Sequence, residues 1–257
     1  MQKLTKDVIQ WIRDYYKDNL EGKAIIGISG GKDSTIVAAL CVEALGADRV
    51  IGVLMPNGLQ SDISDSREVC QYLDIYSLEI NMEEAYDGLV DNIAIALDNN
   101  SKRLKNGFWT VRGNNMIRTN LPARLRMATL YAVAALYPNS RVVNTCNFSE
   151  DYVGYSTKYG DAAGDFSPLG RLTVREVLQI GDDLGLPYKL VHKTPSDGMC
   201  GKSDEDNLGF TYEELDSFLL CERGLSPETM SKVARLHKST RHKYVPMPVY
   251  DPSEGRK

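Results

Sequence analysis

Short apolar runs alternate with longer segments of helical character along much of the chain, and this alternation limits the folds that it can adopt. The runs are rich in β-branched residues, which is typical of buried strands. They occur at 24–29, 49–56, 75–80 and 141–145. Strands that alternate with helices pair in parallel through crossover connections. The sequence therefore predicts an α/β fold in which a parallel sheet is flanked by helices on both faces.

The segments between these runs are assigned to helices or to loops by their patterning. We expect helices at 4–20, 33–45, 61–73, 83–99 and 124–137. We expect loops in three polar segments: 100–120, 149–170 and 192–210. Long loops in a compact domain tend to carry function. No repeat, low-complexity tract or linker interrupts the pattern, so residues 1–257 are expected to form a single domain.

The overall composition argues against several kinds of partner and location. The formal net charge of −5 does not favour a surface that coats nucleic acid. No stretch approaches the roughly 18 consecutive apolar residues of a membrane span, and the N-terminus lacks the apolar core of a signal peptide. The five cysteines are scattered, which indicates reduced thiols. We expect a cytoplasmic protein with no nucleic-acid or membrane partner and, with only three histidines, no zinc site.

The segment Gly27-Ile28-Ser29-Gly30-Gly31-Lys32-Asp33-Ser34 is the strongest functional signal in the sequence. It lies directly after a predicted buried strand and opens a predicted helix. Glycines in such a loop let the backbone approach a phosphate, and amides at a helix start point toward the anion. The hydroxyls of Ser29 and Ser34 add donors. Asp33 would repel a phosphate unless Mg²⁺ lies between them, so the loop predicts a phosphate site with magnesium.

The sequence of this loop distinguishes between two kinds of nucleotide-binding site. It does not match the Walker A pattern, whose first Gly would fall at Ile26 and whose Ser or Thr would fall at Asp33. It does resemble, residue for residue, the S-G-G-x-D-S loop of the ATP pyrophosphatases, which cleave ATP between the α- and β-phosphates. The alternative is a plain Gly-rich turn capped by Asp33. The resemblance implies that Gly27, Ser29, Gly30, Gly31, Lys32, Asp33 and Ser34 bind ATP.

Further segments resemble one branch of the ATP pyrophosphatases, the NAD synthetases. Ser156–Asp161 with Asp165 is similar to their F-T-K-Y-G-D-x-x-x-D stretch, and Asn120–Met127 to their N-x-x-A-R-x-R-M element. The segments 145–150, 203–209, 211–216 and 242–246 resemble later family elements in the same order. The resemblance spans residues 20 to 250 or so. It implies a Rossmann-like fold of the adenine nucleotide alpha hydrolase type.

The resemblance also implies roles for individual residues. Asp33 and Glu150 would hold Mg²⁺, and Thr145 and Ser196 would contact ATP. Deamido-NAD would contact Asn120, Arg124, Lys158, Asp165, His242 and Lys243. Asp33, Lys158 and Asp161 would act in catalysis, with Asp161 near the ammonia site. For Glu150 the alternative is a solvated loop carboxylate, for Asp161 a turn aspartate, and for His242-Lys243 a solvated basic pair that repeats His237-Lys238.

Three positions depart from the family pattern. Val174 stands where the family often has a lysine that reaches the ATP phosphates, so Lys32 or Arg175 is expected to compensate. Pro122 replaces a lysine of the N-x-K-A-R element, and Leu54 replaces an arginine that contacts ATP. These departures concern ATP binding and leave the loop and the expected metal ligands intact.

The reaction that the resemblance implies is the ATP- and Mg²⁺-dependent amidation of deamido-NAD to NAD. The substrate carboxylate would first be adenylated with release of pyrophosphate, and ammonia would then displace AMP. Glutamine-using relatives carry an added amidase domain, for which 257 residues leave no room. We therefore expect free ammonia, or ammonia from a separate glutaminase, and the resemblance implies a homodimer. The competing interpretations are a tRNA-modifying ATP pyrophosphatase and an ATP-binding sensor without catalysis.

Overall fold

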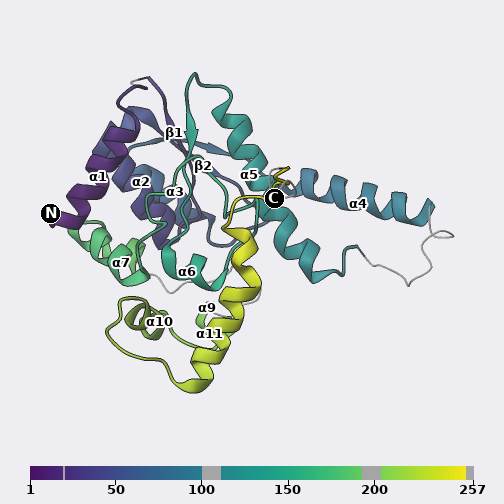
Figure 1. The fold of residues 1–257 in the computed structure, drawn as a ribbon. Coiled ribbons are helices and arrows are strands. Elements are labelled where there is room, and N and C mark those ends of the chain that lie inside the picture. Colours follow the sequence, from purple (N-terminus) through teal and green to yellow (C-terminus); the bar gives the residue numbers. More distant parts are fainter. Residues whose placement is uncertain (20, 100–110, 193–203, 253–257) are drawn as a thin grey trace.

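A parallel sheet forms the centre of the structure, a computed structural model that describes residues 1–19, 21–99, 111–192 and 204–252. Within these residues the strand order is β3-β2-β1-β4 (Figure 1). The strands are β1 (Ala24–Gly27), β2 (Val50–Leu54), β3 (Tyr76–Glu79) and β4 (Arg141–Val142). Ala24 pairs with Val50 on one side and with Arg141 on the other. The predicted parallel sheet is confirmed, with β1 bonded on both edges.

Helices cover both faces of this sheet, as the alternation predicted. Ile25 and Ile26 are neighbours with no exposed surface, and because strand side chains alternate, they enter different cores. Ile26 packs in the core that contains α1 (Lys3–Tyr15), α2 (Lys32–Leu45) and α7 (Val174–Asp183). Ile25 packs in the core formed with α5 (Asn115–Ala134). Figure 1 shows α1 and α5 on opposite sides of the strands.

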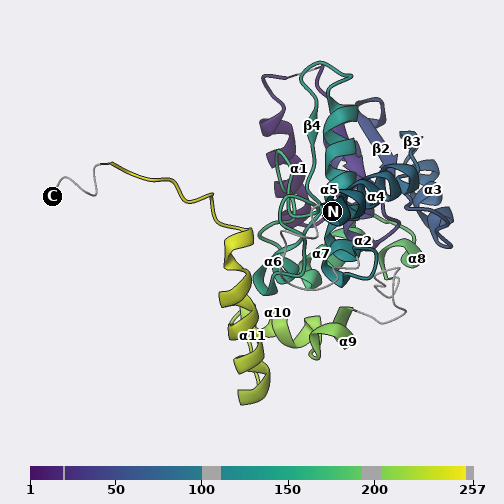
Figure 2. The ribbon, with the colours of Figure 1, turned by 90° about the vertical axis from the view of Figure 1, so that its right-hand side faces the viewer.

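The C-terminal helices form a third apolar cluster beyond the carboxyl ends of the strands. Leu215 of α10 (Tyr212–Leu219) and Val233 of α11 (Pro227–Thr240) pack with residues of α6 (Phe148–Val153) and α7. Figure 2 shows α10 and α11 below α6 and α7, with the chain leaving the body after α11. The remaining elements are η1 (Ala47–Arg49), α3 (Ile63–Tyr72), α4 (Glu83–Asn99), α8 (Tyr188–Val191), α9 (Asp204–Leu208) and η2 (Arg241–Lys243).

The loop predicted at 100–120 is wrong over its last part, because α5 begins at Asn115 rather than at 124. The Asn114 side chain caps this helix: its oxygen accepts hydrogen bonds from the amides of Met116 (2.9 Å) and Ile117 (3.2 Å). Such a cap satisfies amides that would otherwise lack partners at the helix start. The polar sequence concealed the helix because this first stretch of α5 is not periodic in apolar residues. Arg124 and Arg126, expected at the helix start, lie inside it.

The other two predicted loops also contain short helices. α6 lies at the start of the segment predicted as a loop over 149–170, and α9 lies within the segment predicted over 192–210. Asn147 caps α6 by accepting a hydrogen bond from the Glu150 amide at 3.0 Å. Helices of five or six residues are too short to show an apolar period, so the sequence pattern does not reveal them. None of the helices that the structure describes has the length and apolar character needed to cross a bilayer.

Leu215 provides a test of the third cluster. Its side chain has no exposed surface, so Leu215→Ala should lower the free energy of unfolding by about 2–5 kcal/mol through lost burial and a residual cavity. Leu220→Ala, at a 37% exposed position one turn further on, is the control and should change it by less than about 1 kcal/mol. Urea unfolding measures both. Equal small losses would show that α10 does not depend on this packing.

Candidate active site

The glycine-rich loop connects the carboxyl end of β1 to the first turn of α2. Gly30 has a φ of +76°, and a Cβ there would lie 2.9 Å from the Ser66 amide nitrogen, so the loop requires glycine at this position. The hydroxyls of Ser29 and Ser34 lie 3.1 Å apart. Each also accepts a hydrogen bond from a loop amide, Gly31 to Ser29 and Ser29 to Ser34, so they hold the loop in shape. No side chain caps the start of α2, which leaves its first amides directed toward an incoming anion.

Asp33 and Glu150 are brought together although 117 residues separate them in sequence. The Lys32 ammonium lies 2.7 Å from Asp33 Oδ2 and 3.7 Å from Glu150 Oε1. The Asn147 amide links the same two residues, because its nitrogen donates to Asp33 Oδ1 at 3.0 Å and its oxygen caps the Glu150 amide. This arrangement follows from the sheet order, since β1 and β4 are neighbours and both chains leave the sheet at the same edge.

The carboxylates of Asp33 and Glu150 supply only some of the oxygen ligands that a Mg²⁺ ion needs. Both already lie close to one cation, and carboxylate oxygens are the ligands that Mg²⁺ prefers. In the part of the chain that the structure describes, no group of three or more His, Cys, Asp or Glu side chains could hold a metal. Mg²⁺ also usually keeps waters and binds substrate phosphates. The two carboxylates therefore fit a metal that arrives with a nucleotide.

The segment from Gly154 to Asp161 is held by the C-terminal end of α11 and by η2. The Lys243 ammonium donates to the carbonyls of Gly154 (2.8 Å) and Ser156 (2.6 Å). The Lys158 ammonium donates to the His242 carbonyl at 2.6 Å. Burial lowers the pKa of Lys243, while the charge of Asp161 opposes this shift. The expected ligands Lys158, His242 and Lys243 thus lie together, but Lys243 directs its ammonium at the backbone of this segment.

Two carboxyl groups lie at or near the ends of this segment: Asp151 is half-buried, and Asp161 is exposed as a residue although its carboxyl group is desolvated. Asp161 accepts a hydrogen bond from the Thr157 amide at 2.9 Å, and burial raises the pKa of its carboxyl group. Burial and then the charge of Asp161 raise the pKa of Asp151 from 3.8 to about 7. Tyr244, which hydrogen-bonds the Ser156 hydroxyl, contacts Asp151 as well. The site therefore contains a carboxyl group that changes its charge near neutral pH.

A family model described as NAD synthase matches residues 4–247. The chain belongs to the NAD synthase family.

Individual relatives agree with this assignment in sequence and in fold. The NH(3)-dependent NAD(+) synthetase of Carboxydothermus hydrogenoformans is 34% identical over 241 residues, which cover 93% of each chain. The structure of an NMN synthetase from Francisella tularensis matches with a TM-score of 0.83 and 30% identity, over 97% of this chain and 98% of that one. An NH3-dependent NAD synthetase from Campylobacter jejuni matches with a TM-score of 0.71 and 27% identity, over the same shares. The predicted fold type and family are confirmed.

Two further expected ligands of this NAD synthase family member lie close to the Lys158 segment. The Arg124 guanidinium donates to the Lys158 carbonyl at 3.2 Å. Asn120 accepts a hydrogen bond from the Thr157 hydroxyl at 3.0 Å. Both side chains extend from α5, so this helix and the C-terminal segment hold Lys158 from two sides. Their roles in binding a dinucleotide remain predictions.

Asp165, Thr145 and Ser196 are not brought into the same group by these contacts. Asp165 uses both carboxylate oxygens within the protein, accepting from the Val142 amide at 2.7 Å and from the Tyr131 hydroxyl at 3.2 Å. Thr145 is half-buried in the connection from β4 to α6. Ser196 lies outside the described residues. The predicted ligand roles of these three residues stay predictions.

The structure distinguishes the two residues expected to compensate for Val174. The Arg175 guanidinium binds Glu222 at 2.6 Å and Glu213 at 3.0 Å, so it holds the C-terminal helices to α7. Lys32 has its ammonium beside Asp33 and Glu150. Arg126 is half-buried in α5 and donates to the Met55 carbonyl at 3.0 Å, and desolvation lowers its pKa. Only Lys32, of the two candidates, directs its charge at the glycine-rich loop.

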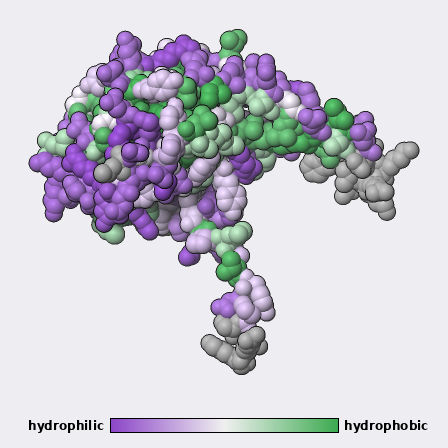
Figure 3. All heavy atoms as spheres, turned by 90° about the horizontal axis from the view of Figure 1, so that it is seen from above, coloured by the Kyte–Doolittle hydropathy of each residue, from purple (hydrophilic) through white to green (hydrophobic). Residues whose placement is uncertain are grey.

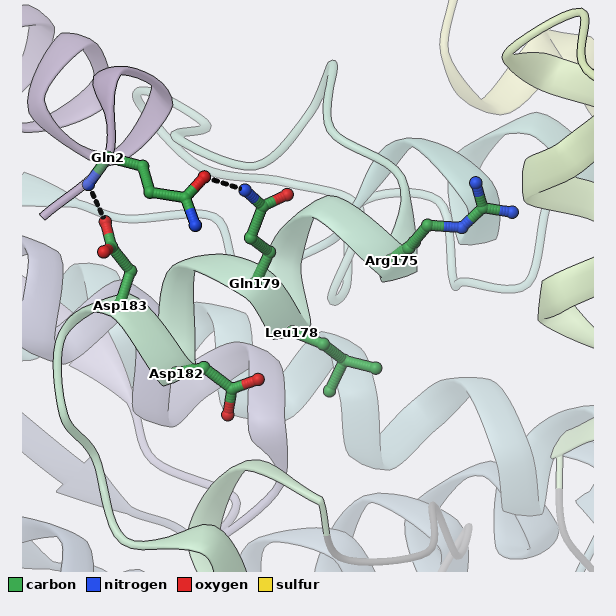
Figure 4. A pocket seen from close by; sticks show the side chains of 6 residues that line it. All are labelled: Gln2, Arg175, Leu178, Gln179, Asp182 and Asp183. Atoms are coloured by element: carbon green, nitrogen blue, oxygen red, sulfur yellow. Dashed lines mark hydrogen bonds between the residues drawn. The ribbon is translucent and has the colours of Figure 1, made fainter.

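A surface hollow lies elsewhere, and its lining contains Arg175 but no residue of the glycine-rich loop or of the segment 154–161. It has a volume of about 490 Å³ between the start of α1 and α7. Figure 4 shows Gln2 and Gln179 hydrogen-bonded across it, with Asp182 and Asp183 at one end and Arg175 at the other. Its lining is that of a polar surface groove, and its position does not connect it to the Lys32 group.

Lys243→Met tests whether this residue supports the loop. Removing the ammonium leaves two half-buried carbonyls without their donor, so the free energy of unfolding should fall by about 1–3 kcal/mol. Lys238→Met changes the exposed copy of the same dipeptide and should have an effect within about 0.5 kcal/mol. Denaturant titration compares them. Equal effects would mean that Lys243 does not hold the 154–161 segment.

Asp151→Asn tests the titrating carboxyl group. Since Asp151 binds its proton more tightly in the folded protein, its stabilising contribution is complete below pH 4 and is lost as the pH rises through 7. The variant should therefore gain about 2–4 kcal/mol of unfolding free energy over the unsubstituted protein between pH 4 and pH 8.

Asp183→Asn is the control for this pH series. A hydrogen bond from Thr5 lowers the pKa of Asp183, so its contribution is lost only as the pH falls through that lower value. The difference in unfolding free energy between Asp183→Asn and the unsubstituted protein should stay constant between pH 5 and pH 8. A level difference for Asp151→Asn over the same range would contradict the assignment of the neutral titration to Asp151.

Proposed function

We propose that the chain catalyses the amidation of deamido-NAD to NAD, using ATP and ammonia. The observation that carries the proposal is the convergence of Asp33 and Glu150 beside the uncapped start of α2, next to the segment that presents Lys158. A phosphate-binding loop with two carboxylates suits MgATP. Relatives that match over most of their length are named NH(3)-dependent NAD(+) synthetases.

The first step follows from the chemistry of a carboxylate. Ammonia does not displace an oxide ion, so the nicotinate carboxylate must first attack the α-phosphate of ATP, which gives an acyl adenylate and releases pyrophosphate. The amides of Lys32, Asp33 and Ser34 would hold the phosphates and stabilise the departing charge. A Mg²⁺ ion held by Asp33 and Glu150 would add charge stabilisation to the leaving pyrophosphate. The fixed loop contributes mainly position and charge.

In the second step ammonia attacks the acyl carbon, a C–N bond forms, the C–O bond to AMP breaks and one proton leaves the nitrogen. Lys158 would orient the dinucleotide from a segment anchored by η2 and α5. Asp161 ends this segment, and desolvation raises the pKa of its carboxyl group, which supports its predicted place near the ammonia site.

The assembly and the location form part of the proposal. α4 and the N-terminal part of α5 project from the body as an arm, and they carry the exposed apolar side chains Leu89, Ile95 and Met116 (Figures 1 and 3). Apolar patches of this kind mark protein contacts, which supports a homodimer. Among the described cysteines, Cys41, Cys70, Cys146 and Cys221 are free thiols, which supports a cytoplasmic location. Ammonia supplied by a separate glutaminase remains compatible with this scheme.

A second candidate substrate is nicotinate mononucleotide, which would give NMN. The observation that favours it is the match to the Francisella tularensis NMN synthetase over nearly the whole of both chains. Both reactions amidate the same nicotinate carboxylate with the same activation by ATP. They differ in whether the substrate carries an adenylate group, so one enzyme assay with both substrates separates them.

The test is a mass-spectrometric assay with MgATP and ammonium chloride, with either deamido-NAD or nicotinate mononucleotide and with a glutamine-only control. We expect NAD with stoichiometric AMP and pyrophosphate, formed only with ammonium. Asp33→Asn should lower kcat by about 100-fold or more, because the site loses one of the two carboxylates expected to hold Mg²⁺ against the phosphates. Asp182→Asn removes an exposed carboxylate on α7 and should leave kcat within about twofold.

The outcomes separate the candidate functions. NMN formed in preference to NAD would replace the dinucleotide by the mononucleotide as substrate. Amide formation with glutamine as the sole nitrogen source would overturn the assignment of ammonia. ATP binding without AMP formation from either nicotinate substrate would overturn the proposed reaction and restore the tRNA-modifying and sensor interpretations.

A further inference from the structure

The side chain of Lys32 is almost completely buried, with 7% of its surface exposed, and it is the one buried lysine in the described part of the chain. Its ammonium lies between Asp33 and Glu150, at 2.7 and 3.7 Å, and 6.0 Å from the centre of the Tyr212 ring. Lysine is rarely buried unless it is paired, because removing an ammonium from water is costly. The position of this side chain is therefore set by the two carboxylates.

The same carboxylates also need Lys32 in the protein without bound ligands. Asp33 and Glu150 are 18% and 15% exposed, so their mutual repulsion is screened by water only in part. Asn147 neutralises neither of them, since it supplies only an amide hydrogen bond to Asp33. In the described part of the chain, the Lys32 ammonium is thus a positive charge that lies close enough to both carboxylates to offset their repulsion.

A divalent metal held by both carboxylates would require the position that this ammonium fills. The two cations would repel each other strongly at such a distance in a partly buried site. Metal alone should therefore bind poorly. Nucleotide phosphates change this balance, because they would lie at the uncapped start of α2, where Lys32 is the first residue, and would give the ammonium a new anionic partner.

We propose that Lys32 is an internal cation that neutralises Asp33 and Glu150 in the free protein and moves to the nucleotide phosphates when a divalent metal binds those carboxylates. The proposal rests on the proposed function only in taking MgATP as the ligand. It makes metal and nucleotide binding mutually dependent. The nucleotide draws away the ammonium that opposes the metal, and the metal neutralises the carboxylates that hold the ammonium back from the nucleotide. A metal ion without nucleotide has to displace Lys32, and a nucleotide without metal has to draw Lys32 away from two carboxylates.

The experiment measures Mn²⁺ binding by electron paramagnetic resonance, with and without an ATP analogue that cannot be cleaved between the α- and β-phosphates. In the unsubstituted protein the analogue should tighten Mn²⁺ binding by about tenfold or more. In Lys32→Met, Mn²⁺ alone should bind about tenfold more tightly than to the unsubstituted protein, because the competing cation is gone. Since Mn²⁺ no longer has to displace a cation in this variant, the further tightening that the analogue produces should be smaller than in the unsubstituted protein.

Two further variants make the result specific. Lys189→Met removes a positive charge from α8, where it pairs with Glu68 at the surface, and should leave Mn²⁺ binding within about twofold. Lys32→Gln provides a polar neutral side chain if Lys32→Met does not fold, and the same tightening is expected from it. Circular dichroism confirms that each variant is folded before titration.

The proposal is overturned if neither neutral variant of Lys32 binds Mn²⁺ more tightly than the unsubstituted protein, or if the analogue leaves Mn²⁺ binding unchanged. This measurement involves no turnover, so it is separate from the test of the reaction. Coupled binding without amide formation would support the exchange of cations and overturn the substrate assignment. Amide formation without tighter Mn²⁺ binding in the Lys32 variants would support the substrate assignment and overturn the exchange of cations.

Discussion

The parallel pairing of β1 with both β2 and β4 is the constraint on which the rest of the structure depends. It directs the glycine-rich loop after β1 and the connection after β4 to the same edge of the sheet. Asp33 and Glu150 can approach one ammonium only because those two strands are neighbours. Both faces of β1 are buried, so its position is fixed by two cores at once. A site assembled at such an edge is held by the most buried part of the molecule.

At that edge, the two carboxylates and the segment that carries Lys158 are held in different ways. The carboxylates near the sheet are held by a buried ammonium and by the Asn147 side chain. The segment that carries Lys158 is instead anchored at its backbone, by Arg124 of α5 and by Lys243 of η2. Two otherwise separate parts of the chain, the middle and the C-terminal helices, thus determine where the same segment lies. Its position depends on packing far from the glycine-rich loop.

Much of the fold could be predicted from the sequence because each strand is indicated by a short run of neighbouring residues. The run at 24–29 is apolar, β-branched and bounded by glycines, and the structure has a strand there. The start of α5 could not be predicted in this way, because its signal is one capping side chain, Asn114, in a polar segment. The loop at 27–34 and Glu150 were found through their resemblance to family motifs. Asp151 and Tyr244 were missed because their only signal is tertiary: Asp151 directly follows a motif, and Tyr244 occupies an unspecified position within one.

The use of Lys243 as a backbone anchor has a consequence for the order in which the protein is made. A nascent chain can pair its first strands early, since domains begin to fold from the N-terminus during synthesis. The carbonyls of Gly154 and Ser156, however, gain their donor only when residue 243 has left the ribosome. The Lys158 segment therefore has this anchor only once nearly the whole chain has been made. A chain interrupted before residue 243 would contain the glycine-rich loop, but the segment that carries Lys158 would not yet be fixed beside it.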